Sequence, residues 1–114
     1  MSAKPKRVTG LRAKQAHFAC EISRLILWAE ENGYEVTLGD AYRDPRVFGM
    51  VGEWKGYGAS KSQHKRRLAM DLNLFIDGEY CYATEDHIPL GEQWEKMGHV
   101  WGGRFNDGNH YQYE

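Results

Sequence analysis

An Asp77-Gly78 pair separates two runs of apolar and aromatic residues in the stretch LAMDLNLFIDGEYCYA, residues 68–83. Asp-Gly is a preferred central pair of the two-residue type I′ turn, because both central positions of that turn require a positive φ. The stretch therefore predicts an antiparallel β-hairpin. Any fold available to this chain has to contain a sheet built around that hairpin.

The other elements follow from local patterns. Between Leu11 and Asn32, apolar residues recur at helical spacing among charged ones and predict one amphipathic helix, with Gly33 as its C′ residue. YEVTLGDAYR, residues 34–43, reads as a short strand and GEQWEKMG, residues 91–98, as a short helix. The glycine-rich segment from Asp44 to Lys61 predicts a long surface loop, and residues 100–114 end in an aromatic strand.

This order of elements predicts an α+β fold, in which one long N-terminal helix packs on a small antiparallel sheet with long irregular loops. A length of 114 residues suits a single domain spanning residues 1–114. The two cysteines, Cys20 and Cys81, lie far apart and lack a CxxC spacing, so we expect two small buried residues.

Charge and hydropathy exclude some functions. A net charge of −1 argues against a dedicated nucleic-acid binder, and we interpret the basic run Lys61, Lys65, Arg66 and Arg67 as a solvated face. The N-terminus has no apolar segment after its positive charges, and no apolar run approaches membrane-spanning length. We therefore expect a soluble protein, made in the cytoplasm without a signal peptide, with a monomer favoured.

Asp71 is the unusual residue of the hairpin, because a carboxylate in an apolar strand costs stability unless a cation compensates its charge. Two histidines and one carboxylate are a standard ligand set for a catalytic zinc ion, which also needs an open position for water. His64 and His110 could complete such a set. Spacing alone leaves open that these are ordinary polar residues, because five histidines allow several such triplets.

The stretch SQHKRRLAMD, residues 62–71, contains His64 and Asp71. It resembles the SxHxxGxAxD motif of the zinc peptidases that cut peptidoglycan peptides. Arg67 stands where the motif has glycine, a residue that tolerates backbone angles arginine resists. AYRD resembles the family's YR element, and NDGNHYQ its C-terminal histidine motif. WGGRF looks like the branch of the family found as phage endolysins.

The resemblance implies roles for individual residues. It implies a Zn²⁺ ion bound by His64, Asp71 and His110. Asp107, three residues before His110, would be the catalytic base, and Arg43 would stabilise the reacting carbonyl.

Further residues have more open roles. Ser62 would bind the substrate peptide or orient His64, and Trp101 would line the substrate groove or belong to the core. Glu92 and Glu95 are the fallback acids if Asp107 points away.

The implied protein is a single zinc peptidase catalytic domain with a fold like that of the D-Ala-D-Ala peptidases and hedgehog proteins. Its implied partner is the peptidoglycan stem peptide, reached after release by another route. We expect an L-alanyl-D-glutamate endopeptidase of a phage or prophage, an endolysin. Three alternatives stay open: a D-alanyl-D-alanine carboxypeptidase, a zinc-containing cell-wall binding module without catalysis, and, with least support, a nucleic-acid adaptor.

Overall fold

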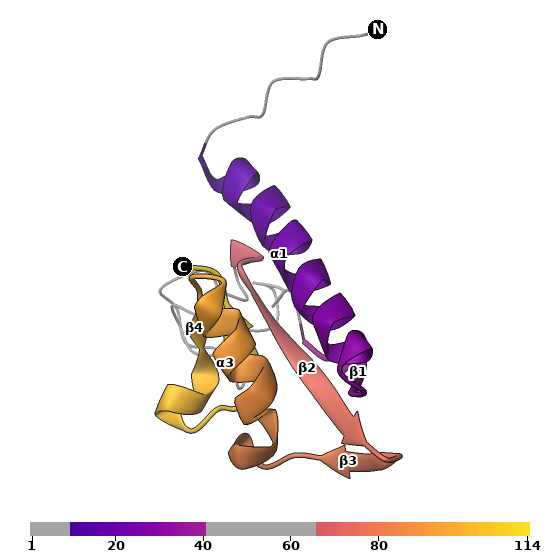
Figure 1. Cartoon of the computed structure of the whole chain (residues 1–114). Coiled ribbons are helices and arrows are strands. Elements are labelled where there is room, and N and C mark those ends of the chain that lie inside the picture. The colour runs from indigo at the N-terminus through magenta and orange to yellow at the C-terminus, as the bar shows by residue number, and fades with distance from the viewer. Residues whose placement is uncertain (1–9, 41–65) are drawn as a thin grey trace, which may run out of the picture.

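The computed structural model of the chain describes residues 10–40 and 66–114. Its helices and strands confirm the α+β prediction (Figure 1). Two short 3-10 turns, Thr84–His87 and Gly102–Phe105, complete the connections. The main elements are α1 (Leu11–Glu31), β1 (Glu35–Leu38), β2 (Ala69–Ile76), β3 (Glu79–Cys81), α3 (Ile88–Lys96), β4 (Val100–Trp101) and β5 (His110–Gln112).

Local signals account for most element boundaries. Asp77 and Gly78 both have positive φ, 53° and 80°, which confirms the type I′ turn between β2 and β3. Gly33 follows α1 with a φ of 86°, as expected of a C′ glycine. Helix α3 begins at Ile88, three residues before the predicted start, because Pro89 occupies its first turn, where a missing N–H is tolerated.

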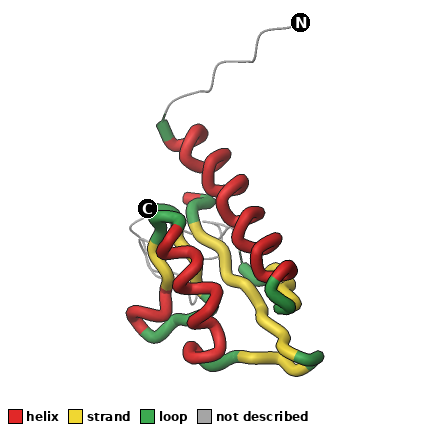
Figure 2. The backbone as a smooth tube through the Cα atoms, viewed as in Figure 1, coloured by secondary structure: helices red, strands yellow, loops and turns green. Residues whose placement is uncertain are grey.

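The strands form one antiparallel sheet with β2 at its centre (Figure 2). β1 pairs with β2 on one edge, through the register Val36 to Leu74. On the other edge, β5 pairs with the first half of β2 and β3 with the second half. β4 then pairs with β5. Residues from the end of the chain are thereby placed beside the middle of the chain.

Side chains of β2 alternate between the two faces of the sheet, as strand geometry requires. Leu72 and Leu74 are fully buried against α1 and α3, and Figure 1 shows α1 running along the length of β2. The core gathers apolar residues of both helices and of three strands, namely Phe18, Ile22, Leu25, Ala29, Leu72, Leu74, Leu90, Trp94, Trp101 and Tyr111. We call the opposite face, which carries Asp71, Asn73 and Phe75, the site face.

The exposure of the two cysteines differs from the prediction made from the sequence. The prediction that both cysteines are buried is wrong: Cys20 is exposed and Cys81 half-buried. Cys20 lies two residues from buried Phe18, about 200° around a helix of 3.6 residues per turn, and so falls on the outer side of α1.

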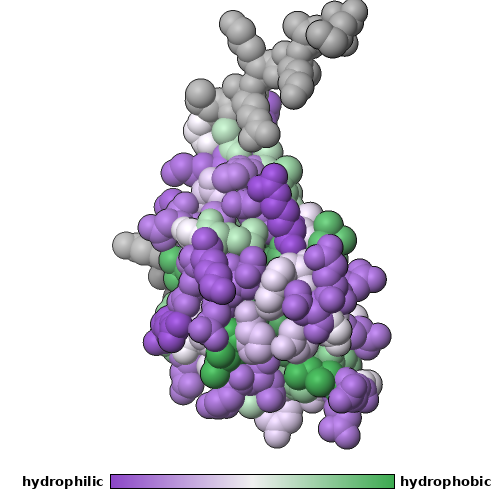
Figure 3. Space-filling view, in the orientation of Figure 1, coloured by the Kyte–Doolittle hydropathy of each residue, from purple (hydrophilic) through white to green (hydrophobic). Residues whose placement is uncertain are grey.

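The surface in Figure 3 is mainly hydrophilic with separate apolar patches. No helix in residues 10–40 or 66–114 is long and apolar enough to cross a membrane.

Candidate functional site

Asp71 and His110 meet on the site face of the sheet. They are direct cross-strand partners in the antiparallel pair β2 and β5, so their side chains point to the same face. His110 Nδ1 lies 3.4 Å from Asp71 Oδ1. The His110 side chain is 9% exposed and that of Asp71 17%. The sheet register therefore places one nitrogen and one oxygen donor together in a largely buried position.

The second ring nitrogen of His110 has its own partner. Nε2 lies 3.0 Å from Gln112 Oε1, and Gln112 follows two residues later on the same face of β5. An amide oxygen only accepts hydrogen bonds, so Gln112 favours the tautomer with the proton on Nε2. In that tautomer the Nδ1 lone pair faces the Asp71 carboxylate, so Nδ1 can take up a metal ion, or a second proton that it then donates to Asp71. This is how histidine ligands of metal ions are commonly oriented.

The surroundings of His110 also shift its pKa. Burial on its own lowers the pKa, but the hydrogen bonds with Asp71 and Gln112 and the negative charges of Asp71 and Asp107 outweigh burial and raise the pKa of His110. The carboxylates of Asp71 and Asp107 thus give the imidazole a negative electrostatic environment. A cation at this position, whether a proton or a metal ion, is favoured by the same carboxylates.

Asp107 lies at the rim of this pair. Its Oδ2 is 4.0 Å from His110 Nδ1, and its side chain is 52% exposed. The turn before β5 fixes this position, because the Asp107 N–H donates to Gly102 O at 2.9 Å and the His110 N–H donates to Asp107 O at 3.1 Å. The carboxylate is therefore solvent-accessible, close to the His110 imidazole, and held by backbone contacts.

Trp101 supports this turn from inside the molecule. Its ring is 3% exposed and its Nε1 donates to Gly108 O at 2.8 Å. Gly91 and Gly103 leave room for the ring, since a Cβ at either position would lie within 2.4 Å of it. Trp101 belongs to the core, as one of its two interpretations held, and its burial does not fit a place in a substrate groove.

Gly102, the first glycine of the WGG motif, lies against the turn that carries Asp107. A Cβ at Gly102 would lie 2.2 Å from Asp107 O and 2.7 Å from His110 Cβ. The close approach of the two segments that brings Asp107 to His110 therefore needs glycine at this position. Close packing beside the candidate site thus accounts for the glycine at this position of the motif.

The structure describes only some of the other sequence candidates. Arg43, Ser62 and His64 fall outside the described residues, as do the loop from Asp44 to Lys61 and two of the basic residues. Glu95 forms an exposed ion pair with Arg104, at 2.7 Å between Oε1 and Nη2.

Gln112 was not predicted from the sequence. Its position two residues after His110, on the same face of a strand, was the signal that could have indicated it.

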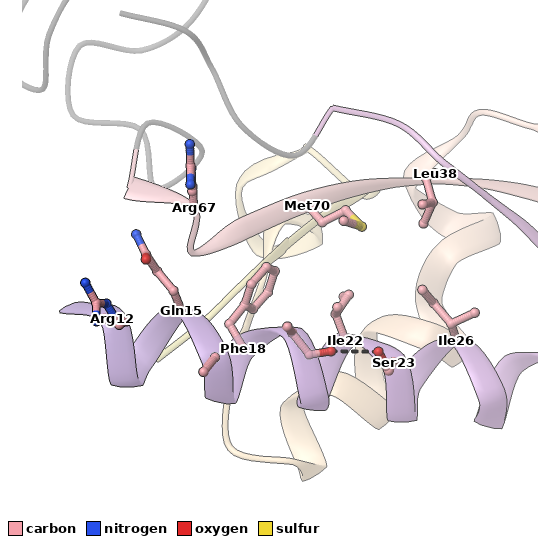
Figure 4. A pocket seen from close by; sticks show the side chains of 11 residues that line it. Arg12, Gln15, Phe18, Ile22, Ser23, Ile26, Leu38, Arg67 and Met70 are labelled. Carbon is pink, nitrogen blue, oxygen red and sulfur yellow. Dashed lines mark hydrogen bonds between the residues drawn. The ribbon is translucent and has the colours of Figure 1, made fainter. Parts of the chain in front are cut away.

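A separate groove of about 550 Å³ lies on the other side of β2 (Figure 4). Phe18 and Ile22 of α1 line it together with Met70, and Arg12 and Arg67 lie at one end. Met70 precedes Asp71 on the strand and so points to the helix side of the sheet. The groove is therefore not the place where Asp71 and His110 meet.

The site face thus combines one carboxylate and one imidazole that could each hold a metal ion, with a second, accessible carboxylate beside them. Among residues 10–40 and 66–114 no group of three or more histidine, cysteine or acidic residues is arranged to hold a metal ion. The donor chemistry still fits such an ion, because two nitrogen or oxygen donors converge and the third sequence candidate, His64, lies outside those ranges. Two metal donors with an accessible carboxylate beside them are parts from which a hydrolytic metal site could be built.

Comparison with known proteins gives the family. The sequence model of the family described as D-alanyl-D-alanine carboxypeptidase matches residues 55–113, just over half of the chain. The chain therefore belongs to this peptidase family. The matched region contains Asp71, Asp107 and His110.

One curated relative is the D-alanyl-D-alanine dipeptidase of Enterococcus faecium. It is 28% identical over an alignment 120 positions long, which covers 81% of this chain. The chain spans 57% of the length of this relative. The similarity supports the family and leaves a large part of the relative without a counterpart here.

Proposed function

We propose that this protein is a zinc metallopeptidase that hydrolyses an amide bond in peptidoglycan stem peptides. The observation that carries the proposal is the cross-strand pair of Asp71 and His110 with Asp107 at its rim, in a chain of this peptidase family. Zinc would be held by Asp71, His110 and His64, and would supply a Lewis acid that lowers the pKa of water to about 7.

The exposure of Asp107 and its position beside His110 support a role as the general base. It is accessible to a water molecule, whereas Asp71 and His110 are largely buried. In the proposed reaction Asp107 accepts a proton from the attacking water and donates it to the nitrogen of the leaving amine. One proton is taken up and one released, so the carboxylate is regenerated in each turnover.

Other residues would position the reacting groups. Gln112 holds His110 in one tautomer through Nε2. Arg43 would stabilise the negative charge on the carbonyl oxygen of the substrate, and Ser62 would bind the peptide or orient His64. The roles of Arg43 and Ser62 rest on the resemblance of their motifs.

Two bonds are candidates for cleavage. The family, described as D-alanyl-D-alanine carboxypeptidase, and the Enterococcus faecium dipeptidase favour a bond at the D-alanyl-D-alanine end of the stem peptide. The WGGRF segment, which packs Asp107 against His110 through Gly102, resembles the endolysin branch and favours the L-alanyl-D-glutamate bond. Action on the cell wall would in either case follow release from the cytoplasm by another route.

Digestion of purified sacculi followed by mass spectrometry of the muropeptides tests the proposal. Cleavage at the carboxyl end releases D-alanine or its dipeptide, and cleavage of L-alanyl-D-glutamate exposes a new N-terminal glutamate. Asp107→Asn serves as the matched inactive control. Unchanged muropeptides after incubation with zinc-loaded protein would rule out the peptidase and favour the binding-module alternative.

A further inference from the structure

Three aromatic rings form a continuous ladder on the β2–β3 hairpin. The ring centroids of Phe75 and Tyr80 are 5.4 Å apart, and those of Tyr80 and Tyr82 are 6.3 Å apart. Phe75 and Tyr80 are direct cross-strand partners, so they share one face of the hairpin, and Tyr82 lies two residues further along on the same side. We call these three residues the aromatic ladder.

Packing within the hairpin does not explain why Tyr80 and Tyr82 expose so much aromatic surface. The pair Phe75 and Tyr80 stabilises the hairpin as a cross-strand aromatic contact. Tyr82, however, is 82% exposed and Tyr80 53% exposed. Most of the surface of both tyrosines therefore faces solvent, with each ring presenting an apolar surface and a hydroxyl group to a ligand.

The aromatic ladder is continuous with the candidate active site. Asp71, Asn73 and Phe75 follow one another on the site face of β2, and Asp71 is the residue paired with His110. Four residues of a strand span about 13 Å, so the ladder begins that far from Asp71. A long ligand whose reacting bond lies at Asp71 and His110 could therefore reach Phe75 along the same strand.

Charge restricts the chemistry of that ligand. The chain has no lysine or arginine between Arg67 and Lys96, whereas Asp77 and Glu79 lie in the hairpin and Glu35 pairs with Phe75. Polymers rich in phosphate would be repelled by these carboxylates. Neutral rings with many hydroxyl groups suit the surface, because aromatic rings stack on their apolar C–H faces and carboxylates and amides accept their hydroxyl protons.

We propose that the aromatic ladder binds the pyranose rings of a neutral glycan, the sugar strand to which the stem peptides are attached. The choice of this glycan rests on the proposed function, because peptidoglycan carries sugar and stem peptide in one substrate. The hairpin then holds the strand while a stem peptide lies along β2 toward Asp71.

Binding to peptide-free glycan tests the proposal without any catalytic readout. The probe is a neutral N-acetylglucosamine oligomer immobilised on beads, because removal of the stem peptides from natural strands would leave charged carboxylates, with bound protein measured against protein concentration. The unmodified protein should be retained, and the Tyr80→Ala/Tyr82→Ala variant should bind at least tenfold more weakly. Tyr80→Phe/Tyr82→Phe keeps the rings and should stay within about threefold of the unmodified protein.

Three further variants serve as controls for the binding measurement. Leu27→Ala removes an exposed apolar side chain from α1, 58% exposed, and should bind like the unmodified protein. Tyr82→Ala alone removes the most exposed ring, so it tests binding even if the double variant unfolds. Asp107→Asn should still bind, because the aromatic ladder does not include the proposed general base. Unmodified protein that binds the glycan but leaves sacculi uncut would count against the proposed function alone.

Three results would overturn the proposal. They are no retention of the unmodified protein, equal retention of the double alanine variant with intact circular dichroism, or a concentration-dependent dimer that Tyr82→Ala abolishes. The last result would assign the aromatic ladder to contact between two copies of the chain.

Discussion

Asp71 on β2 and His110 on β5 occupy directly opposed positions, and His110 Nδ1 faces Asp71 Oδ1 at 3.4 Å on the side of the sheet away from the helices. Thirty-nine residues separate the two along the chain, so only the pairing of β5 with β2 brings them together. That pairing answers the question that Asp71 raises in the sequence. Its charge is placed where a histidine, and a cation bound with it, can compensate it.

Replacing Asp107 by asparagine should separate metal binding from catalysis. Asp107→Asn preserves the shape of the side chain at a 52% exposed position and removes the proton acceptor. We expect intact folding and zinc content, with hydrolysis reduced roughly a hundredfold to ten-thousandfold. Initial rates on purified sacculi, with zinc measured on the same samples, check this. Loss of zinc would identify Asp107 as a ligand, and full activity would move the base to another residue such as Glu92 or Glu95.

Gln112 should act on metal affinity through His110. Gln112→Met keeps a side chain of similar length but removes the acceptor at 3.0 Å from Nε2. Zinc affinity should fall about tenfold to a hundredfold, as for other partners of metal-bound histidines. Competition with a chromophoric chelator measures the affinity. Gln112→Glu retains an acceptor and should restore most of it, whereas equal affinities for all three proteins would exclude a positioning role.

Arg67 should be a strained residue. Its φ is 60°, in the left-handed region, at the position where the family motif has glycine. Arg67→Gly should raise the free energy of unfolding by about 1 kcal/mol, because a side chain in this conformation costs roughly 1–2 kcal/mol and glycine loses more freedom on folding. Arg67→Ala retains the backbone strain and is the matched control. Urea unfolding measures the stability of both variants. Equal free energies of unfolding for Arg67→Gly and Arg67→Ala would argue against strain at this position.

His87 should make the fold sensitive to acid. Burial lowers the pKa of His87 below its ordinary value of 6.5, although a hydrogen bond with the Cys81 backbone and the charge of Asp86 oppose the shift. Its Nδ1 lies 2.8 Å from the hydroxyl of Tyr111, and both residues are buried. Between the lowered pKa and 6.5 the unfolded chain binds a proton that the folded chain does not.

The free energy of unfolding should therefore be constant above about pH 6.5 as far as His87 is concerned, and fall by up to about 1.4 kcal/mol per pH unit below it. The loss should stop once the pH is below the lowered pKa of the folded state. Urea unfolding at several pH values measures the slope. His87→Gln cannot titrate and should lose this part of the slope, and an unchanged slope in that variant would assign the acid sensitivity to other groups.

Much of the architecture was predictable because its signals are local. Asp77-Gly78 predicted the turn of the hairpin, and the spacing of Phe18, Ile22 and Leu25 predicted the buried side of α1. The early start of α3 was missed because the segment before Gly91 has little apolar periodicity and begins with a proline in its first turn.

The candidate site depends on contacts between distant segments, and such contacts leave no local pattern. Periodicity could not show that β5 lies beside β2, so the family motifs were needed to connect Asp71 with His110. The even choice for Trp101 between groove and core had the same cause. Its burial depends on the two glycines, Gly91 and Gly103, that leave space for the ring on both sides.

Zinc content is the most direct test of the account. Elemental analysis of protein purified without chelators should find about one zinc per chain, and the Asp71→Ala/His110→Ala variant should contain almost none, since a mononuclear site has few ligands to spare. Circular dichroism should show that the variant keeps its helices. Full zinc content in the folded double variant, or unmodified protein that holds no zinc and takes up none when it is added, would contradict the proposed site.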